Sequence, residues 1–186
     1  MRIIAGEGGG RRIRAPRGRD TRPTADRVRE ALFNILASGL KECRFLDLFA
    51  GSGGVGLEAL SRGADEVVFV EKDPVAAGVI RRNIDDLNLP GKRSVYQADV
   101  FAFIRSWSRD APGFDIVFLD PPYRQGLEEK TLDAISRATR LLTNNGIVVV
   151  ESARSDFPLE RIGSMVLERR RFYGDTALSF YRMEEA

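Results

Sequence analysis

The strongest constraint on the fold is a regular alternation between short apolar segments and longer amphipathic ones. Five apolar segments are predicted strands, at residues 45–49, 66–71, 94–100, 114–120 and 146–151. Segments with helical periodicity lie between them, at residues 54–62, 73–89, 101–108 and 128–142. Strands that are apolar on both faces and connected by helices form a parallel sheet with helices on both sides. The sequence therefore predicts an α/β fold.

The N-terminal segment is basic and differs from the rest of the chain. Residues 2–5 and 11–14 flank three glycines, a pattern that predicts a β-hairpin. The first 22 residues carry seven arginines and two acidic residues, a local charge of +5, whereas the whole chain carries +2. The arginines are Arg2, Arg11, Arg12, Arg14, Arg17, Arg19 and Arg22. A basic arm suits contact with a phosphate backbone, and a solvated terminus is the alternative. We therefore expect a β-hairpin arm at residues 1–22 and one domain at residues 23–186.

Two further elements complete the predicted order. An amphipathic helix is expected between an N-cap at Thr24 and a stop at Gly39. Near the C-terminus, residues 165–173 and 177–183 alternate in polarity on either side of a Gly-Asp turn, which predicts an antiparallel hairpin.

Composition excludes several kinds of protein. The chain has one cysteine, Cys43, and no histidine, so it has no internal disulfide, no Cys-rich zinc site and no Ser-His-Asp or Cys-His catalytic scheme. We expect no metal. The chain is 43% hydrophobic and 30% charged and lacks the ~18 consecutive apolar residues of a membrane span. The expectation is a cytoplasmic protein without membrane contact, and a monomer.

A glycine-rich loop follows the first predicted strand of the alternating region. Residues 51–56 read Gly-Ser-Gly-Gly-Val-Gly and lead into a helix, as a nucleotide-binding loop does. Glu71 ends the second strand, where an acid that hydrogen-bonds a ribose diol is expected. NAD and S-adenosylmethionine fit these features equally well.

Three acidic residues favour S-adenosylmethionine. Asp47 lies in the strand that enters the glycine loop, where a carboxylate can receive an ammonium group but would repel a pyrophosphate. Asp99 ends the third strand at the height of an adenine amino group, although a role as a helix N-cap is equally open. Asp120 ends the fourth strand. Together with Glu71, these acids end four successive strands on one rim of the predicted sheet.

Residues 120–123 read Asp-Pro-Pro-Tyr at the tip of the fourth strand. The prolines stiffen the turn and leave their carbonyl groups as acceptors. Asp120 and the Pro121 carbonyl can hold the hydrogens of an exocyclic amino group while Tyr123 stacks on its ring. Packing beneath the loop is the alternative role of Tyr123.

These motifs resemble those of class I S-adenosylmethionine-dependent methyltransferases that modify amino nitrogens. The basic hairpin and the following segment, residues 22–34 (Arg-Pro-Thr-Ala-Asp-Arg-Val-Arg-Glu-Ala-Leu-Phe-Asn), resemble the RsmD family of bacterial 16S rRNA methyltransferases. Ala25 departs from the Thr or Ser expected in that segment, and Gly54 is an addition to the usual glycine loop. The resemblance spans essentially the whole chain.

The resemblance implies a Rossmann-like sheet of seven strands in the order 3-2-1-4-5-7-6, with the last-numbered strand antiparallel. It implies methyl transfer from S-adenosylmethionine to N2 of guanine 966 in 16S rRNA, with the small ribosomal subunit or its assembly intermediates as the partner. The cofactor contacts would be Asp47, Phe49, Gly51, Ser52, Gly53, Gly56, Glu71, Lys72, Asp99 and Val100. Asp120, Pro121 and Tyr123 would be catalytic, and Arg2, Arg11, Arg12, Arg14, Arg22 and Arg27 would contact RNA.

Several alternatives stay open from the residues alone. The target could be adenine N6 in DNA or RNA, or a protein glutamine amide. An NAD(P) oxidoreductase is disfavoured by Asp47 and by the missing proton donor. A non-catalytic RNA-binding module would have no need of the four acids. A 5-methylcytosine enzyme would need a cysteine in the fourth-strand loop, and Cys43 precedes the first strand.

Overall fold

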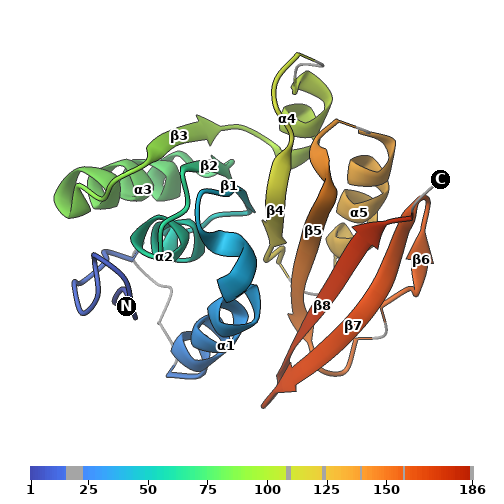
Figure 1. The fold of residues 1–186 in the computed structure, drawn as a ribbon, viewed down its shortest axis with the longest axis horizontal. Coiled ribbons are helices and arrows are strands. Elements are labelled where there is room, and N and C mark those ends of the chain that lie inside the picture. The colour runs from blue at the N-terminus through green and yellow to red at the C-terminus, as the bar shows by residue number, and fades with distance from the viewer. Residues whose placement is uncertain (16–22, 108–109, 123–124, 139, 157, 185–186) are drawn as a thin grey trace.

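The computed structural model describes residues 1–15, 23–107, 110–122, 125–138, 140–156 and 158–184, with the backbone alone for residues 23–25. One mixed sheet runs through the molecule (Figure 1). Its strands are β1 (Arg44–Leu48), β2 (Glu66–Glu71), β3 (Lys92–Gln97), β4 (Phe114–Leu119), β5 (Leu142–Ala153), β6 (Arg161–Ile162), β7 (Met165–Tyr173) and β8 (Thr176–Met183). Their order in space is β3-β2-β1-β4-β5-β8-β7-β6.

The predicted α/β class and strand order are confirmed, with one addition. Strands β1 to β5 are parallel, β8 runs antiparallel to β5, and β7 runs antiparallel to β8. The sheet has eight strands, whereas seven were predicted, because the two-residue β6 pairs with the start of β7 at the edge. Two residues are too few to show a periodic pattern.

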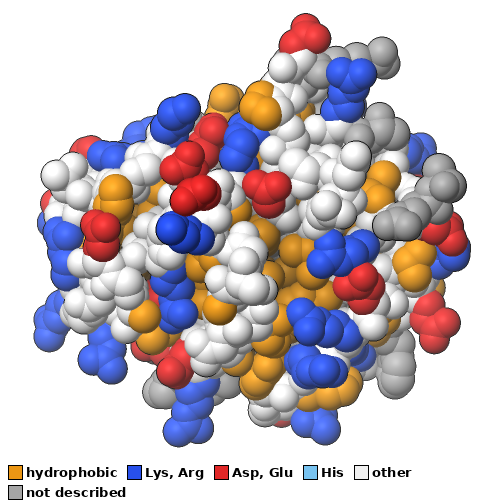
Figure 2. Space-filling model, viewed as in Figure 1, with side chains coloured by type: hydrophobic (Ala, Val, Ile, Leu, Met, Phe, Trp, Pro, Cys, Tyr) orange, Lys and Arg blue, Asp and Glu red, His pale blue; other side chains and the backbone are white. Residues whose placement is uncertain are grey.

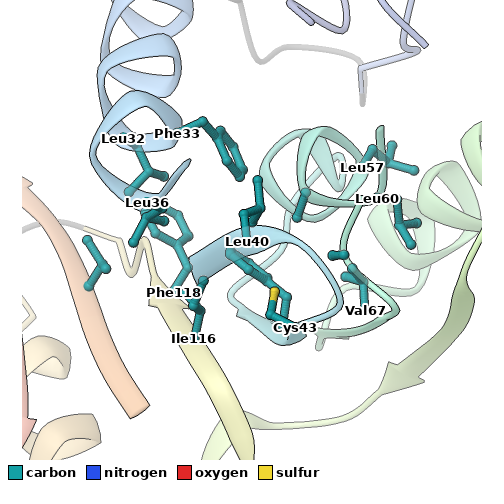
Figure 3. Close-up of a cluster of buried hydrophobic side chains, with 14 of the residues drawn as sticks. Leu32, Phe33, Leu36, Leu40, Cys43, Leu57, Leu60, Val67, Ile116 and Phe118 are labelled. Atoms are coloured by element: carbon teal, nitrogen blue, oxygen red, sulfur yellow. The ribbon is translucent and has the colours of Figure 1, made fainter. Parts of the chain in front are cut away.

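Five helices cover the sheet on both faces, as expected. They are α1 (Pro23–Leu40), α2 (Gly54–Ser61), α3 (Pro74–Leu87), α4 (Val100–Ser106) and α5 (Leu127–Arg137). Helices α1, α2 and α3 share a buried core with Phe45 of β1 and Phe118 of β4. Helices α4 and α5 pack on the other face, over Leu46 and Val117. Figure 3 shows part of the first core, with Leu36 of α1 close to Phe118.

Three predicted boundaries were wrong for local reasons. Strand β3 ends at Gln97 rather than at residue 100, because the Asp99 side chain caps α4 by accepting hydrogen bonds from Phe101 N at 3.0 Å and Ala102 N at 3.1 Å. Helix α5 ends at Arg137 rather than at residue 142, and β5 starts early because Leu142 pairs with Phe114. By contrast, Asp73 caps α3 and Pro74 occupies its first turn, as predicted.

No helix in the described ranges is long and apolar enough to span a bilayer.

The N-terminal segment, residues 1–15, packs against the sheet domain. The predicted hairpin appears as one isolated antiparallel bridge between Arg2 and Arg12, flanked by a hydrogen bond from Ile3 N to Arg11 O of 2.9 Å. The side chains of Ile3 and Ile13 are buried in the core beneath α1 and α2. The segment is therefore held by apolar burial as well as by its own pairing.

Glu58 of α2 is the main polar anchor of this segment. Its side chain is fully buried, and its two oxygens accept hydrogen bonds from Ile4 N at 2.7 Å and Ala5 N at 3.0 Å. Arg62 Nε donates to the same carboxylate at 2.7 Å. A buried carboxylate is stable only with such partners, so the two parts stabilise each other.

We predict that Glu58→Ala lowers the free energy of unfolding by about 3–5 kcal/mol, because it breaks a buried ion pair and leaves two backbone N–H groups without an acceptor. The measurement is urea denaturation, combined with hydrogen exchange at Ile4 and Ala5. Glu30→Ala, at an exposed position of α1, is the control and should change stability by less than about 0.5 kcal/mol. Equal stability of the two variants would contradict the anchoring role.

Candidate active site

A cavity of about 330 Å³ opens at the carboxyl ends of β1, β2 and β4. Its described lining residues are Phe49, Val70, Glu71, Lys72, Asp99, Val100, Phe101, Asp120, Pro121, Pro122 and Leu127. Seven of these were predicted from the sequence as cofactor or catalytic residues: Phe49, Glu71, Lys72, Asp99, Val100, Asp120 and Pro121. The structure thus brings residues from four separate strand ends into one pocket.

The loop after β1 has an unusual backbone. Phe49, Gly51 and Gly53 all have positive φ, at 61°, 57° and 78°. Phe49 is not a glycine, so its left-handed conformation costs about 1–3 kcal/mol and must be held by its surroundings. A hydrogen bond of 3.0 Å from Ala50 N to Val70 O ties this loop to the end of β2. The loop is therefore a fixed wall of the pocket.

Glu71 joins this loop to the start of α3. Its oxygens accept hydrogen bonds from Gly51 N and from Asp73 N, each at 2.8 Å. The side chain is mostly buried but still lines the cavity. Its carboxylate is therefore oriented by the backbone before any ligand arrives.

Asp47 lies beneath the glycine loop and is 2% exposed. One of its oxygens accepts a hydrogen bond of 2.9 Å from Gly56 N. The pKa of Asp47 is raised to about 7, mainly by burial and also by the negative charges of Asp120 and Glu71, and the hydrogen bond from Gly56 N opposes this shift. Gly56 is needed here, because a Cβ would lie 2.3 Å from the Phe69 ring.

Glu151 is an acidic residue of this rim that the sequence analysis did not assign to the site. Val150 pairs with Leu119, so Glu151 follows at the level of Asp120. Burial and, to a smaller extent, the negative charge of Asp120 together raise the pKa of Glu151 to about 8. The available signal was its position, since it ends the fifth strand as the other acids end theirs. The charge of Asp120 raises the pKa of both Asp47 and Glu151, and we call these three side chains the carboxyl cluster.

Asp99 has a structural role in addition to its place in the pocket. It caps α4 with one oxygen, the alternative that its sequence position left open. It also lines the cavity beside Val100 and Phe101. Phe101 and Leu127 add apolar walls that the sequence did not identify, because a helix start gives no direct signal of what it faces.

The glycine-loop residues predicted to bind the cofactor are not among the described lining residues of the cavity. Gly51, Ser52, Gly53 and Gly56 form the loop itself, and Ser52 O accepts a hydrogen bond of 3.1 Å from Asn83 Nδ2. Tyr123, predicted to be catalytic, and Arg22, predicted to contact RNA, fall outside the residues that the structure describes.

The N-terminal arginines divide into two groups. Arg11 donates to the carbonyls of Leu87 and Asp86, and Arg14 forms a 2.8 Å ion pair with Asp86. Their guanidinium groups therefore hold the segment against α3. Arg2, Arg12 and Arg27 are exposed, and no ion pair joins them to the described residues.

Asn83 connects the N-terminal segment to the glycine loop. This buried side chain accepts from Arg14 N at 2.9 Å and donates to Arg14 O at 3.0 Å as well as to Ser52 O. The predicted RNA-binding segment and the predicted cofactor loop thus share one hydrogen-bonding residue.

We predict that Asp47→Asn removes a pH-dependent loss of stability. Asp47 loses its proton near pH 4 in the unfolded chain, whereas burial raises its pKa to about 7 in the folded one. Between these pH values ionisation favours the unfolded chain, so the stability of the wild type falls as pH rises from about 4 to 7. Thermal unfolding should therefore show that the stability of the variant relative to the wild type increases from about pH 4 to pH 7. Above this range the difference in stability should stay constant. Parallel stability curves from pH 4 to pH 8 would contradict the buried, pKa-shifted state of Asp47.

Comparison with known proteins identifies the family. The family model described as conserved hypothetical protein 95 matches residues 1–182. Putative rRNA methyltransferase YlbH of Bacillus subtilis is 37% identical over 182 residues, which cover 98% of each chain. Ribosomal RNA small subunit methyltransferase D of Escherichia coli is 34% identical and covers 99% of this chain and 90% of its own.

Among solved structures, a putative methyltransferase from Escherichia coli, yhhF, superposes with a TM-score of 0.83 at 34% identity. The match covers 100% of this chain and 99% of that one, so the likeness includes both the N-terminal segment and the terminal hairpin. The chain therefore belongs to the RsmD family of methyltransferases, the family that its sequence motifs resemble.

Proposed function

We propose that this chain transfers a methyl group from S-adenosylmethionine to the exocyclic N2 of a guanine, position 966, in 16S rRNA of the small ribosomal subunit. The observation that supports it most is the carboxyl cluster beside the rigid Asp120-Pro121-Pro122 turn. This arrangement suits a cationic cofactor on one side and an amino group on the other. The relatives named as ribosomal RNA small subunit methyltransferases support the choice of RNA.

The carboxyl cluster fits S-adenosylmethionine better than a dinucleotide. Burial and mutual repulsion raise the pKa of Asp47 and of Glu151, so a positive ligand charge would relieve the repulsion. A pyrophosphate would increase it. Asp47 would receive the methionine ammonium group and Glu71 the ribose hydroxyls. Asp99 would accept from the adenine amino group, with Val100 beside the ring.

The remaining assigned residues would shape the cofactor site. Phe49, Gly51, Ser52, Gly53 and Gly56 would provide the loop surface, and Lys72 the outer wall. When bound, S-adenosylmethionine supplies an activated methyl group, which makes a strong catalytic base unnecessary. A chain without histidine is therefore chemically sufficient for this reaction.

Asp120 and Pro121 would act on the target amine. The lone pair of guanine N2 is delocalised into the ring, so it must be localised before it can attack. Hydrogen bonds from the N2 hydrogens to the Asp120 carboxylate and the Pro121 carbonyl would favour tetrahedral nitrogen and stabilise its developing positive charge. Asp120 or water would take the proton. Holding the reactants in line contributes up to about 7–11 kcal/mol in favourable cases.

RNA binding would involve the exposed N-terminal arginines. Arg2 and Arg12 face each other across the antiparallel bridge, where like charges repel. A phosphate between them would convert that repulsion into attraction, and Arg27 would extend the same surface. Arg11 and Arg14 would contribute less than predicted, because Asp86 and the end of α3 already engage them. Arg22 and the stacking residue Tyr123 complete the proposed contacts with a guanine turned out of its stack.

The decisive experiment is methyl transfer from labelled S-adenosylmethionine to small-subunit particles from a strain that lacks the gene, followed by nucleoside mapping. We predict that the label appears in N2-methylguanine at one position. Label in N6-methyladenine or only in protein would favour an amino-methyltransferase of another target. The matched variant Asp120→Ala should lose transfer by about 10²-fold or more and still bind S-adenosylhomocysteine. Full turnover by this variant would remove Asp120 from the reaction.

A further inference from the structure

Strand β7 presents a row of arginines at the same level of the sheet as the active site. Glu151 lies level with Asp120, and β8 pairs Leu178 with Glu151 on one side and with Arg171 on the other. Arg171 is thus three strands from Asp120, or about 14 Å at the usual spacing of 4.7–4.9 Å between strands. The pairing register alone establishes this proximity.

Arg169 and Arg171 point to the face of the sheet that α1 covers. The Arg169 guanidinium lies 4.5 Å from the centre of the Phe180 ring, which belongs to the core beneath α1. Because side chains two residues apart share a face, Arg171 points the same way. Phe118 of β4 belongs to the same core, and Asp120 follows it at the tip of that strand. Figure 2 shows Lys and Arg side chains gathered over β7 and β8 in this view.

The positive charge of this strand is not neutralised within the described structure. Arg171 donates to Arg170 O at 3.1 Å, Arg170 to Ala153 O at 3.2 Å, and Arg154 to Gly174 O at 3.3 Å. These contacts are with carbonyl groups. Among the described residues, no carboxylate forms an ion pair with Arg169, Arg170 or Arg171 of β7, or with the neighbouring Arg154. The carboxylate of Glu168 on the same strand pairs instead with Arg182, at 3.0 Å. Fixed and unneutralised guanidinium groups are suited to phosphate.

The outer edge of β7 is also open where these arginines lie. Strand β6 pairs only with Met165 and Val166, so residues 167–173 have no further strand beside them in the described part of the chain. Phe172 is 48% exposed there, with Arg154 at 5.0 Å and Arg170 at 4.9 Å from its ring centre. Charges on a sheet edge also prevent unwanted strand pairing, which is the alternative role for this cluster.

We propose that Arg169 and Arg171 bind backbone phosphates of the rRNA strand next to the target guanine. The proposal rests on the proposed function, and it adds a second contact surface to the N-terminal arginines. The two surfaces lie on opposite sides of α1, with the N-terminal segment beyond α2 and β7 beyond β8 (Figure 1). An RNA strand held on both sides would present its turned-out guanine to the Asp120-Pro121-Pro122 turn at the end of β4.

The test compares the double variant Arg169→Gln and Arg171→Gln with the wild type. We predict weaker binding to a protein-free fragment of small-subunit rRNA and a salt dependence, log K against log[salt], that is less steep by about 1.4–1.8 for two lost phosphate contacts. In steady-state assays KM for RNA should rise with little change in kcat. Affinity for S-adenosylhomocysteine should not change, because neither arginine lines the cofactor cavity.

The matched control is Arg105→Gln and Arg137→Gln, two exposed arginines on the helices α4 and α5 that cover the opposite face. The control should bind RNA like the wild type. If both double variants behave alike on naked RNA, or if the β7 variant loses affinity only for protein-containing particles, the RNA contact is wrong. A wild-type chain that methylates neither the rRNA fragment nor small-subunit particles would overturn the proposed function itself, and this inference with it.

Discussion

Electrostatic crowding at the carboxyl rim of the sheet governs the rest of this structure. Strands β2, β1, β4 and β5 are neighbours, and each brings an acidic side chain to the same rim: Glu71, Asp47, Asp120 and Glu151. Parallel strands necessarily end together, so acids at their ends must lie close to one another. Burial then weakens the solvent screening that would otherwise separate them electrically. The fold therefore holds negative charge where a cationic ligand would be most stabilised.

The surroundings of the rim keep these acids in place. Backbone N–H groups of the glycine loop donate to Glu71 and Asp47, and the hydrogen bond from Ala50 N to Val70 O ties the loop to β2. The N-terminal segment is built onto the same scaffold, through Glu58 of α2 and Asn83 of α3. The proposed RNA surface and the proposed cofactor loop consequently depend on shared buried residues. A substitution at Glu58 or Asn83 should therefore affect both the proposed RNA surface and the proposed cofactor loop.

Much of this arrangement could be predicted from the sequence where a residue has one dominant local role. The order of apolar segments predicted the sheet, and Asp73-Pro74 predicted the start of a helix. The Asp-Pro-Pro turn predicted that Asp120 lies at the end of the fourth strand. The errors arose where two roles compete. Asp99 looks like the end of a strand but caps the next helix, and residues 138–142 look helical but turn into β5. Glu151 was missed because its meaning depends on pairing with β4, and Leu127 because a helix start says nothing about what it faces.

The carboxyl rim is expected to select a positively charged ligand, and calorimetry of S-adenosylmethionine binding near pH 7 tests this selectivity most directly. In buffers with different ionisation enthalpies, binding should release protons, because the ligand's positive charge lowers the raised pKa values of Asp47 and Glu151. NADH should not bind under the same conditions. Binding without proton release, or tight binding of NADH, would contradict the account.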